Sequence, residues 1–317
     1  MKIMDAASLA VGVDVGGTHV SAALVDVLGQ RLRREGWQRL ALDSGAEAGP
    51  ILDALGGVIE RVLRAAPASC APRPVGLSFP GPCDYARGVV QLRPPEKYGA
   101  LFGQNLASLL VGRLARVGGG SVRLSNDAAC FAWGEHTIRR DRAPVNTLAL
   151  TLGTGFGAAF ILDGALCAAG PRVPPDGHLY NQPFRTGQAD NYFSTRWLVR
   201  RYRELTGAEL AGAKELAELA RPADAVMPRQ VFAEMAENLA TFLTPWLRRA
   251  AIGRIIFGGN ISRAWPLFEK TLVGGLAAGG LAVELLRSED AEGSAVLGAA
   301  LFAATQPGPR PAGKDSP

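Results

Sequence analysis

An Asn-Asp pair is the part of this chain whose residue types and position most directly suggest chemistry. Asn126 and Asp127 stand where an apolar strand at residues 122–124 gives way to a helix at residues 128–138. An Asn or Asp in that place is ordinarily a helix N-cap. The chemical alternative is that Asn126 holds a substrate hydroxyl while Asp127 takes the proton from the attacking one. Phosphoryl transfer needs such a carboxylate near the nucleophile, together with positioning and charge stabilisation.

A first glycine turn follows the opening strand, residues 9–15, and contains Gly16 and Gly17. Two glycines let the backbone turn tightly and come close to a ligand, so that its N–H groups can meet phosphate oxygens. Asp14, at the strand end, would hold Mg²⁺ directly or through its water shell. Thr18 offers a hydroxyl. Taken alone, this string could also be an ordinary tight hairpin.

A second glycine turn, Gly153-Thr154-Gly155, follows an apolar strand at residues 147–152. With Gly157, its glycines fall at every second position and leave one face of the hairpin without side chains. A triphosphate could lie against that face, although glycine bulges occur in many β-rich proteins. Because strand, glycine turn and strand occur twice, near residue 15 and near residue 153, the chain is predicted to contain a duplicated module, one copy in each half.

A third glycine pair, Gly258-Gly259, ends a predicted strand at residues 254–257. The missing side chains leave room for a planar adenine or a ribose. The simpler interpretation is a strand-to-helix turn with Ser262 as the N-cap.

The remaining elements follow from hydrophobic periodicity and from glycine and proline. Residues 171–188 are expected to form a loop, and the helix at 230–247 to kink or break at Pro245. Residues 306–317 are rich in proline and glycine and are expected to be disordered. Further strands are predicted at residues 20–25, 33–39, 74–79 and 157–162, and further helices at residues 46–65, 102–114, 191–202 and 291–304.

Composition excludes several classes of protein. The 317 residues are 48% hydrophobic, enough for a large core in two domains. The chain shows no apolar run of membrane-spanning length and no signal peptide, so we expect a cytoplasmic protein. The net charge of +5 comes from arginines without interleaved aromatic residues, so nucleic acid is not an expected partner. The four cysteines, expected to be reduced thiols, are Cys70, Cys83, Cys130 and Cys167.

Taken in order, these motifs resemble those of the ROK family of sugar kinases and repressors, over almost the whole chain. The resemblance implies an α/β architecture: a duplicated ribonuclease-H-like fold of the actin and hexokinase superfamily, with an interdomain cleft. It implies a small N-terminal domain at residues 1–122 and a large C-terminal domain at residues 123–305, followed by the tail at 306–317.

The resemblance also implies roles for the residues of each motif. The first turn and Gly153–Gly157 match the two phosphate motifs of the family, and Gly258-Gly259 matches its adenosine motif. Asn126 and Asp127 match the sugar-binding Asn and the catalytic Asp. Residues 77–84 match a segment whose glycine, here Gly81, approaches the sugar.

The sequence departs from the family after residue 170. His178 follows Gly177 as in the family, but Pro175 replaces a glutamate, for which Asp176 is a candidate substitute. The zinc-binding cysteines are absent from residues 179–188, so no zinc site is expected. His178 could therefore keep only its sugar contact, and the alternative is a structural loop histidine.

Two acidic residues are further candidates for the sugar pocket. Asp190, four residues before Ser194, could replace a second sugar-binding glutamate of the family with a shorter side chain. Glu96 lies where the family has an Asn followed by a Trp, and could be a sugar ligand or a solvated loop charge.

The sequence thus predicts an ATP-dependent hexose kinase that uses Mg²⁺, with a sugar substrate and Asp127 as general base. The resemblance favours the 6-hydroxyl as the nucleophile and glucose as the sugar, with N-acetylated hexosamines and fructose close behind, and a homodimer. Whether ATP or polyphosphate is the donor stays open. The main alternative is a sugar-sensing homologue with weak or no catalysis. A repressor is disfavoured, because only about eight residues precede the first strand.

Overall fold

The computed structural model describes residues 8–68, 71–140, 145–222 and 224–305, which form two compact units. The first unit is Met1–Ile138 with Glu292–Pro317, and the second is Arg139–Ala291. The expected boundary between residues 122 and 123 falls inside strand β8, Gly119–Asn126, which pairs with β5 of the first unit. The last helix, α8 (Ala291–Thr305), also belongs almost entirely to the first unit.

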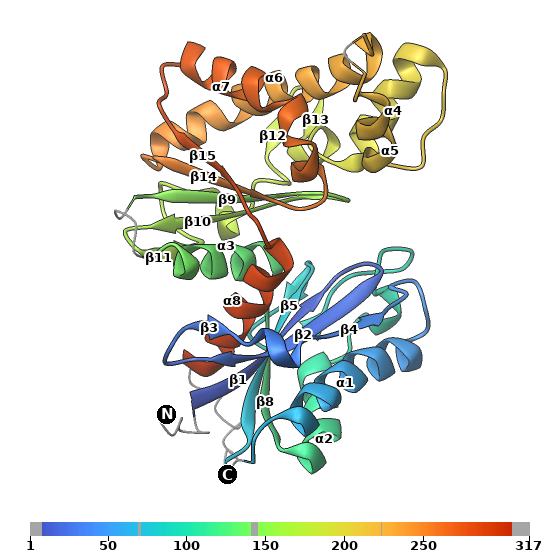
Figure 1. Ribbon diagram of the computed structural model, residues 1–317, viewed down its shortest axis with the longest axis vertical. Helices are drawn as coiled ribbons and strands as arrows, with labels where there is room; N and C mark the ends of the chain where they lie inside the picture. The colour runs from blue at the N-terminus through green and yellow to red at the C-terminus, as the bar shows by residue number, and fades with distance from the viewer. Residues whose placement is uncertain (1–7, 69–70, 141–144, 223, 306–317) are drawn as a thin grey trace, which may run out of the picture. The chain divides into compact units, whose positions relative to one another are not determined.

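The first unit is built on a six-stranded sheet in the order β3-β2-β1-β5-β8, with β4 also paired to β2 (Figure 1). Strands β1, β5 and β8 run parallel, and β2 is antiparallel to β1. The sheet therefore places the carboxyl ends of three neighbouring strands along one edge. The bounds of its other strands are Leu9–Val15 for β1, His19–Asp26 for β2, Arg31–Leu32 for β3, Gln38–Ala41 for β4 and Arg73–Phe79 for β5.

Helices cover both faces of this sheet. Val11 and Val13 of β1 are buried in one core with Ile51 of α1 (Ala48–Ala65) and Leu106 of α2 (Leu106–Leu114). Alternate residues of a strand point to opposite faces. Consequently Gly12 faces the other side, where α3 (Asp127–Ile138) and α8 lie.

Glycines allow α8 to approach the sheet and α3 closely. A methyl group on Gly12 would lie 1.9 Å from the carbonyl oxygen of Val296, and one on Gly298 of α8 would lie 1.9 Å from that of Cys130. Such distances leave no room for any side chain, so backbone packs directly against backbone. This contact explains why the C-terminal helix belongs to the first unit.

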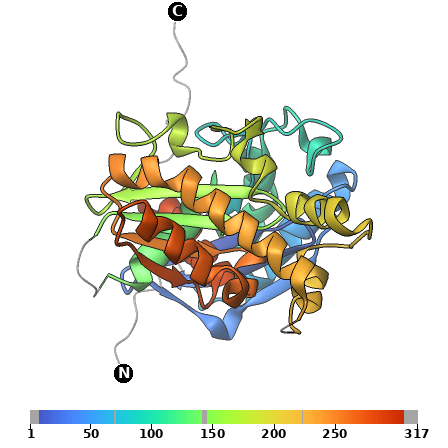
Figure 2. The same cartoon turned by 90° about the horizontal axis from the view of Figure 1, so that it is seen from above.

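The second unit contains a five-stranded sheet in the order β11-β10-β9-β14-β15. Helices α6 and α7 lie side by side on one face of this sheet (Figures 1 and 2). The strands are β9 (Thr147–Leu152), β10 (Phe156–Leu162), β11 (Ala165–Cys167), β14 (Arg254–Gly258) and β15 (Glu284–Arg287), and the helices are α4 (Thr195–Thr206), α5 (Ala213–Leu219), α6 (Val226–Arg249) and α7 (Glu269–Ala278).

The two sheets share one topology. If β4, which pairs only with β2, is set aside, each sheet has five strands. Numbered in chain order, these five strands lie side by side in the order 3-2-1-4-5 in both sheets. In each, the first strand is antiparallel to the second and parallel to the fourth. The predicted duplication is therefore present in the fold.

Some predicted elements differ from those observed. The polar strand expected at residues 33–39 is split by a short 3-10 helix, Arg34–Gly36. Helix α2 begins only at Leu106, because the Asn105 side chain accepts a hydrogen bond from Ser108 N at 2.9 Å and caps it there. Helix α6 continues through Pro245, held by buried residues such as Phe242 and Leu247 on either side.

Two other expectations concern the chain ends and the membrane. The tail expected at residues 306–317 lies outside the described residues. Among the described residues, no helix combines the length and apolar character that a membrane span requires.

Candidate functional site

Several predicted site residues lie at the carboxyl ends of the parallel strands in the first unit. Asp14 of β1 is paired with Ser78 of β5, and Ser78 with Ser125 of β8. Asp127 is the first residue of α3, directly after β8. Three neighbouring strands thus bring Asp14 and the Asn126-Asp127 pair to one edge of the sheet.

The Asp14 carboxyl is surrounded by other acidic groups. Its pKa is raised to about 7, mainly by burial and also by the nearby carboxylates of Glu292 and Asp127, while a hydrogen bond from Ser78 acts in the opposite direction. Ser78 Oγ donates to Asp14 Oδ1 at 2.8 Å. Glu292 lies in the first turn of α8. Among the described residues, no three His, Cys, Asp or Glu side chains lie close enough together to bind a metal ion by themselves.

Glu292 is itself fixed by β2. The Ser21 hydroxyl donates to Glu292 Oε1, and His19 Nε2 lies 3.2 Å from the same oxygen. Arg39 Nε lies 3.8 Å away. These contacts hold a carboxylate beside Asp14 that the sequence motifs did not single out.

Asn126 and Asp127 both bind the start of α3. Ala129 N donates to Asn126 Oδ1 at 3.1 Å, and Ala128 N donates to Asp127 Oδ1 at 2.8 Å. The N-cap interpretation is therefore correct for Asn126, and it is compatible with a functional role because a carbonyl oxygen has two lone pairs. The helix N-terminus also favours negative charge on Asp127.

Tyr85 positions the other end of the Asn126 amide. Asn126 Nδ2 donates to Tyr85 Oη at 3.2 Å, and Tyr85 Oη donates to the carbonyl oxygen of Phe79 at 3.1 Å. Burial and the Asp127 charge raise the pKa of Tyr85, so its hydroxyl keeps its proton. A methyl group on Gly81 would lie 2.9 Å from Tyr85 Oη, which places the predicted sugar glycine beside this network.

The first glycine turn forms the expected tight connection between β1 and β2. Gly16 N donates to the carbonyl oxygen of His19 at 3.0 Å, and Thr18 is exposed. The Tyr98 hydroxyl donates to the carbonyl oxygen of Gly16. A methyl group on Gly17 would lie 2.6 Å from Lys97 Nζ. A loop distant in sequence therefore packs directly on this turn.

In the second unit, the second glycine turn is closed by a hydrogen bond from Gly153 N to the carbonyl oxygen of Gly155 at 3.0 Å. Thr154 at its tip is exposed. The carbonyl oxygen of Gly153 accepts from Thr195 N at 2.8 Å and from Thr195 Oγ1 at 2.9 Å. The start of α4 thereby holds the turn.

The third glycine pair lies against the second turn. Gly258 of β14 is paired with Thr151 of β9. Gly259 has a φ of +81°, and a methyl group on it would lie 2.3 Å from the carbonyl oxygen of Leu152. Only glycine combines this conformation with such a close approach. The two motifs predicted to contact nucleotide in this half are thus neighbours within one unit.

Asp190 contacts the second turn. Its Oδ1 accepts a hydrogen bond from Phe156 N at 2.8 Å, and Arg196 pairs with its Oδ2. A methyl group on Gly155 would lie 3.2 Å from Asp190 Oδ1. The carboxylate therefore supports the glycine turn, a role that the sequence did not suggest, and the sugar contact stays a prediction.

Three loop candidates remain: His178, Asp176 and Glu96. His178 is half-buried, and its ring centroid lies 5.4 Å from that of Tyr180. Asp176, the candidate substitute for the family glutamate, is exposed and has a φ of +56°. Glu96 is exposed, and its Oε2 accepts from Arg93 N at 2.9 Å, which supports the loop interpretation.

The sequence motifs did not identify the residues that hold the predicted site residues in place. Ser78, Tyr85 and Tyr98 bind the predicted residues through hydrogen bonds, and Lys97 lies over a predicted turn. Ser78 lies within the 77–84 segment, Tyr85 follows it directly, and Lys97 and Tyr98 follow Glu96. Their contacts depend on pairings between distant parts of the chain, which the sequence alone does not give.

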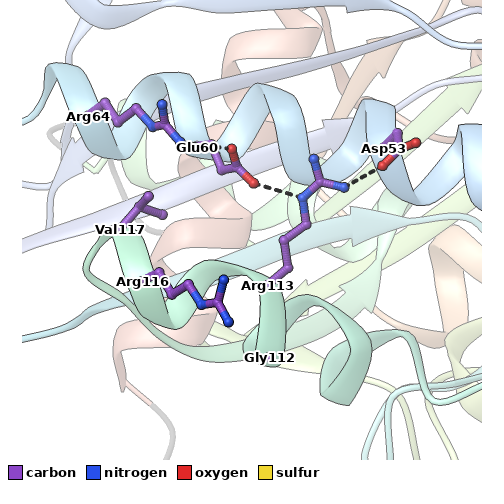
Figure 3. Close-up of a pocket in the computed structure, with 7 residues that line it drawn as sticks. All are labelled: Asp53, Glu60, Arg64, Gly112, Arg113, Arg116 and Val117. Carbon is purple, nitrogen blue, oxygen red and sulfur yellow. Dashed lines mark hydrogen bonds and ion pairs between the residues drawn. The ribbon is translucent and has the colours of Figure 1, made fainter.

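A surface hollow of about 590 Å³ lies elsewhere in the first unit, between α1 and α2 (Figure 3). Arg113 spans it, with Nε 2.7 Å from Glu60 Oε1 and one terminal nitrogen 2.6 Å from Asp53 Oδ1. These ion pairs join the two helices, and none of the predicted site residues lines the hollow.

Comparison with solved structures identifies the class of fold. The ROK hexokinase from Thermus thermophilus superposes with a TM-score of 0.72 at 23% identity, covering 93% of this chain and 97% of that one. A ROK family glucokinase from Streptomyces griseus, solved in complex with glucose and AMPPNP, gives 0.71 at 21% identity, covering 93% and 99%. The predicted actin-like and hexokinase-like fold is confirmed.

Comparison of sequences identifies the family. The model of the ROK family matches residues 10–306, so this chain belongs to the ROK family. The glucokinase of Thermotoga maritima is 29% identical over 320 residues, covering 92% of this chain and 95% of the relative. An N-acetyl-D-glucosamine kinase of Yersinia enterocolitica is 24% identical over 283 residues, covering 82% and 86%. These relatives support the predicted class of enzyme, a sugar kinase.

Proposed function

We propose that this chain is an ATP-dependent hexose kinase that phosphorylates the 6-hydroxyl of its sugar, with Asp127 as the general base. The observation that carries the proposal is the electrostatic proximity of Asp14, at the carboxyl end of β1, to Asp127, directly after β8, with β5 between the two strands. The Asp14 carboxylate is suited to hold a metal ion that binds phosphate, and the Asp127 carboxylate is suited to accept the proton of an attacking hydroxyl.

In the proposed reaction, Asn126 orients the sugar while Asp127 accepts the hydroxyl proton. The sugar oxygen forms a bond to the terminal phosphorus as the bond between that phosphorus and ADP breaks. The hydrogen bond from Ala128 N fixes the Asp127 carboxylate at the helix start. General-base help of this kind contributes about 10²–10⁴-fold to the rate.

Mg²⁺ fits the residues around Asp14. The raised pKa of this carboxyl reflects burial and the neighbouring charges of Glu292 and Asp127, and a divalent cation would relieve that repulsion. Carboxylate oxygens and water are the ligands that Mg²⁺ prefers. When bound, the ion would neutralise charge on the phosphates. Asp14 would hold it directly or through water, and Ser78 would orient the carboxylate.

The other predicted residues divide into nucleotide and sugar contacts. For the nucleotide we propose two sets, one in each unit: Gly16, Gly17 and Thr18 in the first, and Gly153, Thr154, Gly155, Gly258 and Gly259 in the second. For the sugar we propose Gly81, Asn126, His178 and Asp190. The contact of Asp190 with Phe156 N would link sugar binding to the second glycine turn.

Glucose is the first candidate for the substrate, because a glucokinase is among the relatives, and N-acetylated hexosamines are next for the same reason. Fructose is a further candidate. ATP is the proposed donor, and polyphosphate is the alternative. We also propose a homodimer, which light scattering on the purified chain would test.

A coupled assay of ADP release tests the function. The chain is incubated with Mg²⁺, ATP and each sugar in turn, and a parallel series replaces ATP with polyphosphate and follows sugar phosphate. The proposal predicts turnover with at least one hexose. Sugar binding by calorimetry without turnover under any condition would instead support the sugar-sensing alternative.

A further inference from the structure

The loop that follows Arg93 carries a positive charge to the first glycine turn. A methyl group built on Gly17 would lie 2.6 Å from Lys97 Nζ, 3.2 Å from its Cε and 3.6 Å from its Cδ. The end of the lysine side chain therefore extends along Gly17. Lys97 as a whole residue is exposed.

The neighbouring residue fixes this arrangement. Tyr98 is fully buried in a left-handed conformation with a φ of +60°. Its hydroxyl donates to the carbonyl oxygen of Gly16, and its N–H donates to the carbonyl oxygen of Ser44 at 2.7 Å. Its ring packs on Phe79, with centroids 5.1 Å apart. Lys97 thus directly precedes Tyr98, a residue that is hydrogen-bonded to the turn.

The Tyr98 hydroxyl also interacts electrostatically with Asp14. Burial and the charge of Asp14 raise the pKa of Tyr98, which places Tyr98 within electrostatic reach of the proposed magnesium-holding carboxylate. The loop is itself tightly folded, since a methyl group on Gly99 would lie 2.6 Å from Pro94 N. The lysine therefore extends from a tightly folded loop.

A compact ammonium group at this position is suited to bind the phosphoryl group that is being transferred. Charge accumulates on the equatorial oxygens of that group, and a fixed cation stabilises it. We propose that Lys97 binds the terminal phosphoryl group of the donor over Gly17 and stabilises it during transfer. Lys97 keeps its proton throughout. The inference rests on the proposed kinase function and adds a residue that none of the sequence motifs contains.

The test compares wild type with Lys97→Met, which removes the ammonium and keeps most of the side-chain length. Calorimetry measures the binding of AMPPNP and of ADP, each with Mg²⁺. Because AMPPNP carries a γ-phosphoryl group and ADP does not, the affinity for AMPPNP should fall by about tenfold while that for ADP stays within about twofold. In the coupled assay kcat should fall by about 10²-fold, and Lys97→Arg should restore part of it.

Lys270→Met is the matched control, since Lys270 is an exposed lysine of α7 in the second unit, and it should behave as wild type. Equal melting temperatures of all variants would show that the fold is intact. If Lys97→Met keeps wild-type kcat and the wild-type ratio of AMPPNP to ADP affinity, the Lys97 assignment is wrong while the kinase function stands. If wild type turns over no sugar, the kinase function fails, and the affinity ratio still tests whether Lys97 recognises the terminal phosphate.

Discussion

Ser78 Oγ donates a hydrogen bond to Asp14 Oδ1 at 2.8 Å, across the parallel pair of β1 and β5. This bond favours the charged carboxylate, but burial and the charges of Glu292 and Asp127 outweigh it, and the pKa of Asp14 rises to about 7. The carboxyl therefore changes charge near neutral pH. Protons and divalent cations should compete for it in that range.

The stability of the apo protein should report this pKa. Because the folded-state pKa of about 7 lies above the ordinary value of 3.8, the folded state binds more protons than the unfolded state between these values. The contribution of Asp14 to stability should therefore fall as pH rises from about 4 to 7 and level off above. Melting temperatures of wild type and Asp14→Asn, measured with a chelator across this range, test it.

The difference in melting temperature, wild type minus Asp14→Asn, should decrease steadily over that range. Adding Mg²⁺ at pH 8 should raise the melting temperature of wild type and leave that of the variant unchanged. A pH-independent difference would mean that the Asp14 carboxyl is ionised throughout, contrary to this account.

Tyr85→Phe tests the support of Asn126. The variant keeps the ring but loses the hydroxyl that accepts from Asn126 Nδ2 and donates to Phe79. We expect the KM for the sugar to rise by about 3–10-fold, the cost of one hydrogen bond, with a smaller change in kcat. An unchanged KM would show that the amide needs no such support.

Gly259→Ala tests the glycine pair of the second unit. The left-handed φ and the approach of 2.3 Å to the carbonyl oxygen of Leu152 should destabilise the protein by about 2 kcal/mol and weaken ADP binding. Gly274→Ala is the control, because nothing lies within 4 Å of its added methyl. That variant lies within α7 and should be stabilised by about 0.5–1 kcal/mol. Urea unfolding and calorimetry measure both effects, and equal behaviour of the two variants would contradict the account.

Gly298→Ala tests the packing of α8 in the first unit. The added methyl would meet the carbonyl oxygen of Cys130 at 1.9 Å, so α8 must shift from α3. We expect a loss of about 3 kcal/mol in the free energy of unfolding. Gly112→Ala in α2, where nothing lies within 4 Å, should cause no loss. A wild-type denaturation midpoint for Gly298→Ala would refute the packing.

Local patterns predicted most of the architecture. The apolar runs that became β1 and β9 were placed at their observed bounds, and the repeated glycine turn revealed the duplication. Such features depend on a few consecutive residues. The place of α8 could not be predicted in this way, because it depends on Gly12 and Gly298 meeting backbone more than a hundred residues away in the chain.

The motif residues of the candidate site were predicted from the sequence. The residues that hold them in place were not. Asp14 and Asp127 were found because each lies at or just beyond the carboxyl end of a recognisable strand. Glu292, Tyr98 and Lys97 were not, because the residues they contact are distant in sequence. Asp190 was found for its position relative to Ser194, yet its observed partners are Phe156 N and Arg196.

The central claim is that Asp127 is the base that accepts the sugar proton. Asp127→Asn keeps an oxygen able to accept from Ala128 N, so the start of α3 should stay intact. With the best sugar of the panel, the account predicts that kcat for ADP release falls by about 10²–10⁴-fold, while the dissociation constant of the sugar stays within about threefold. Turnover by Asp127→Asn at the wild-type rate would contradict it.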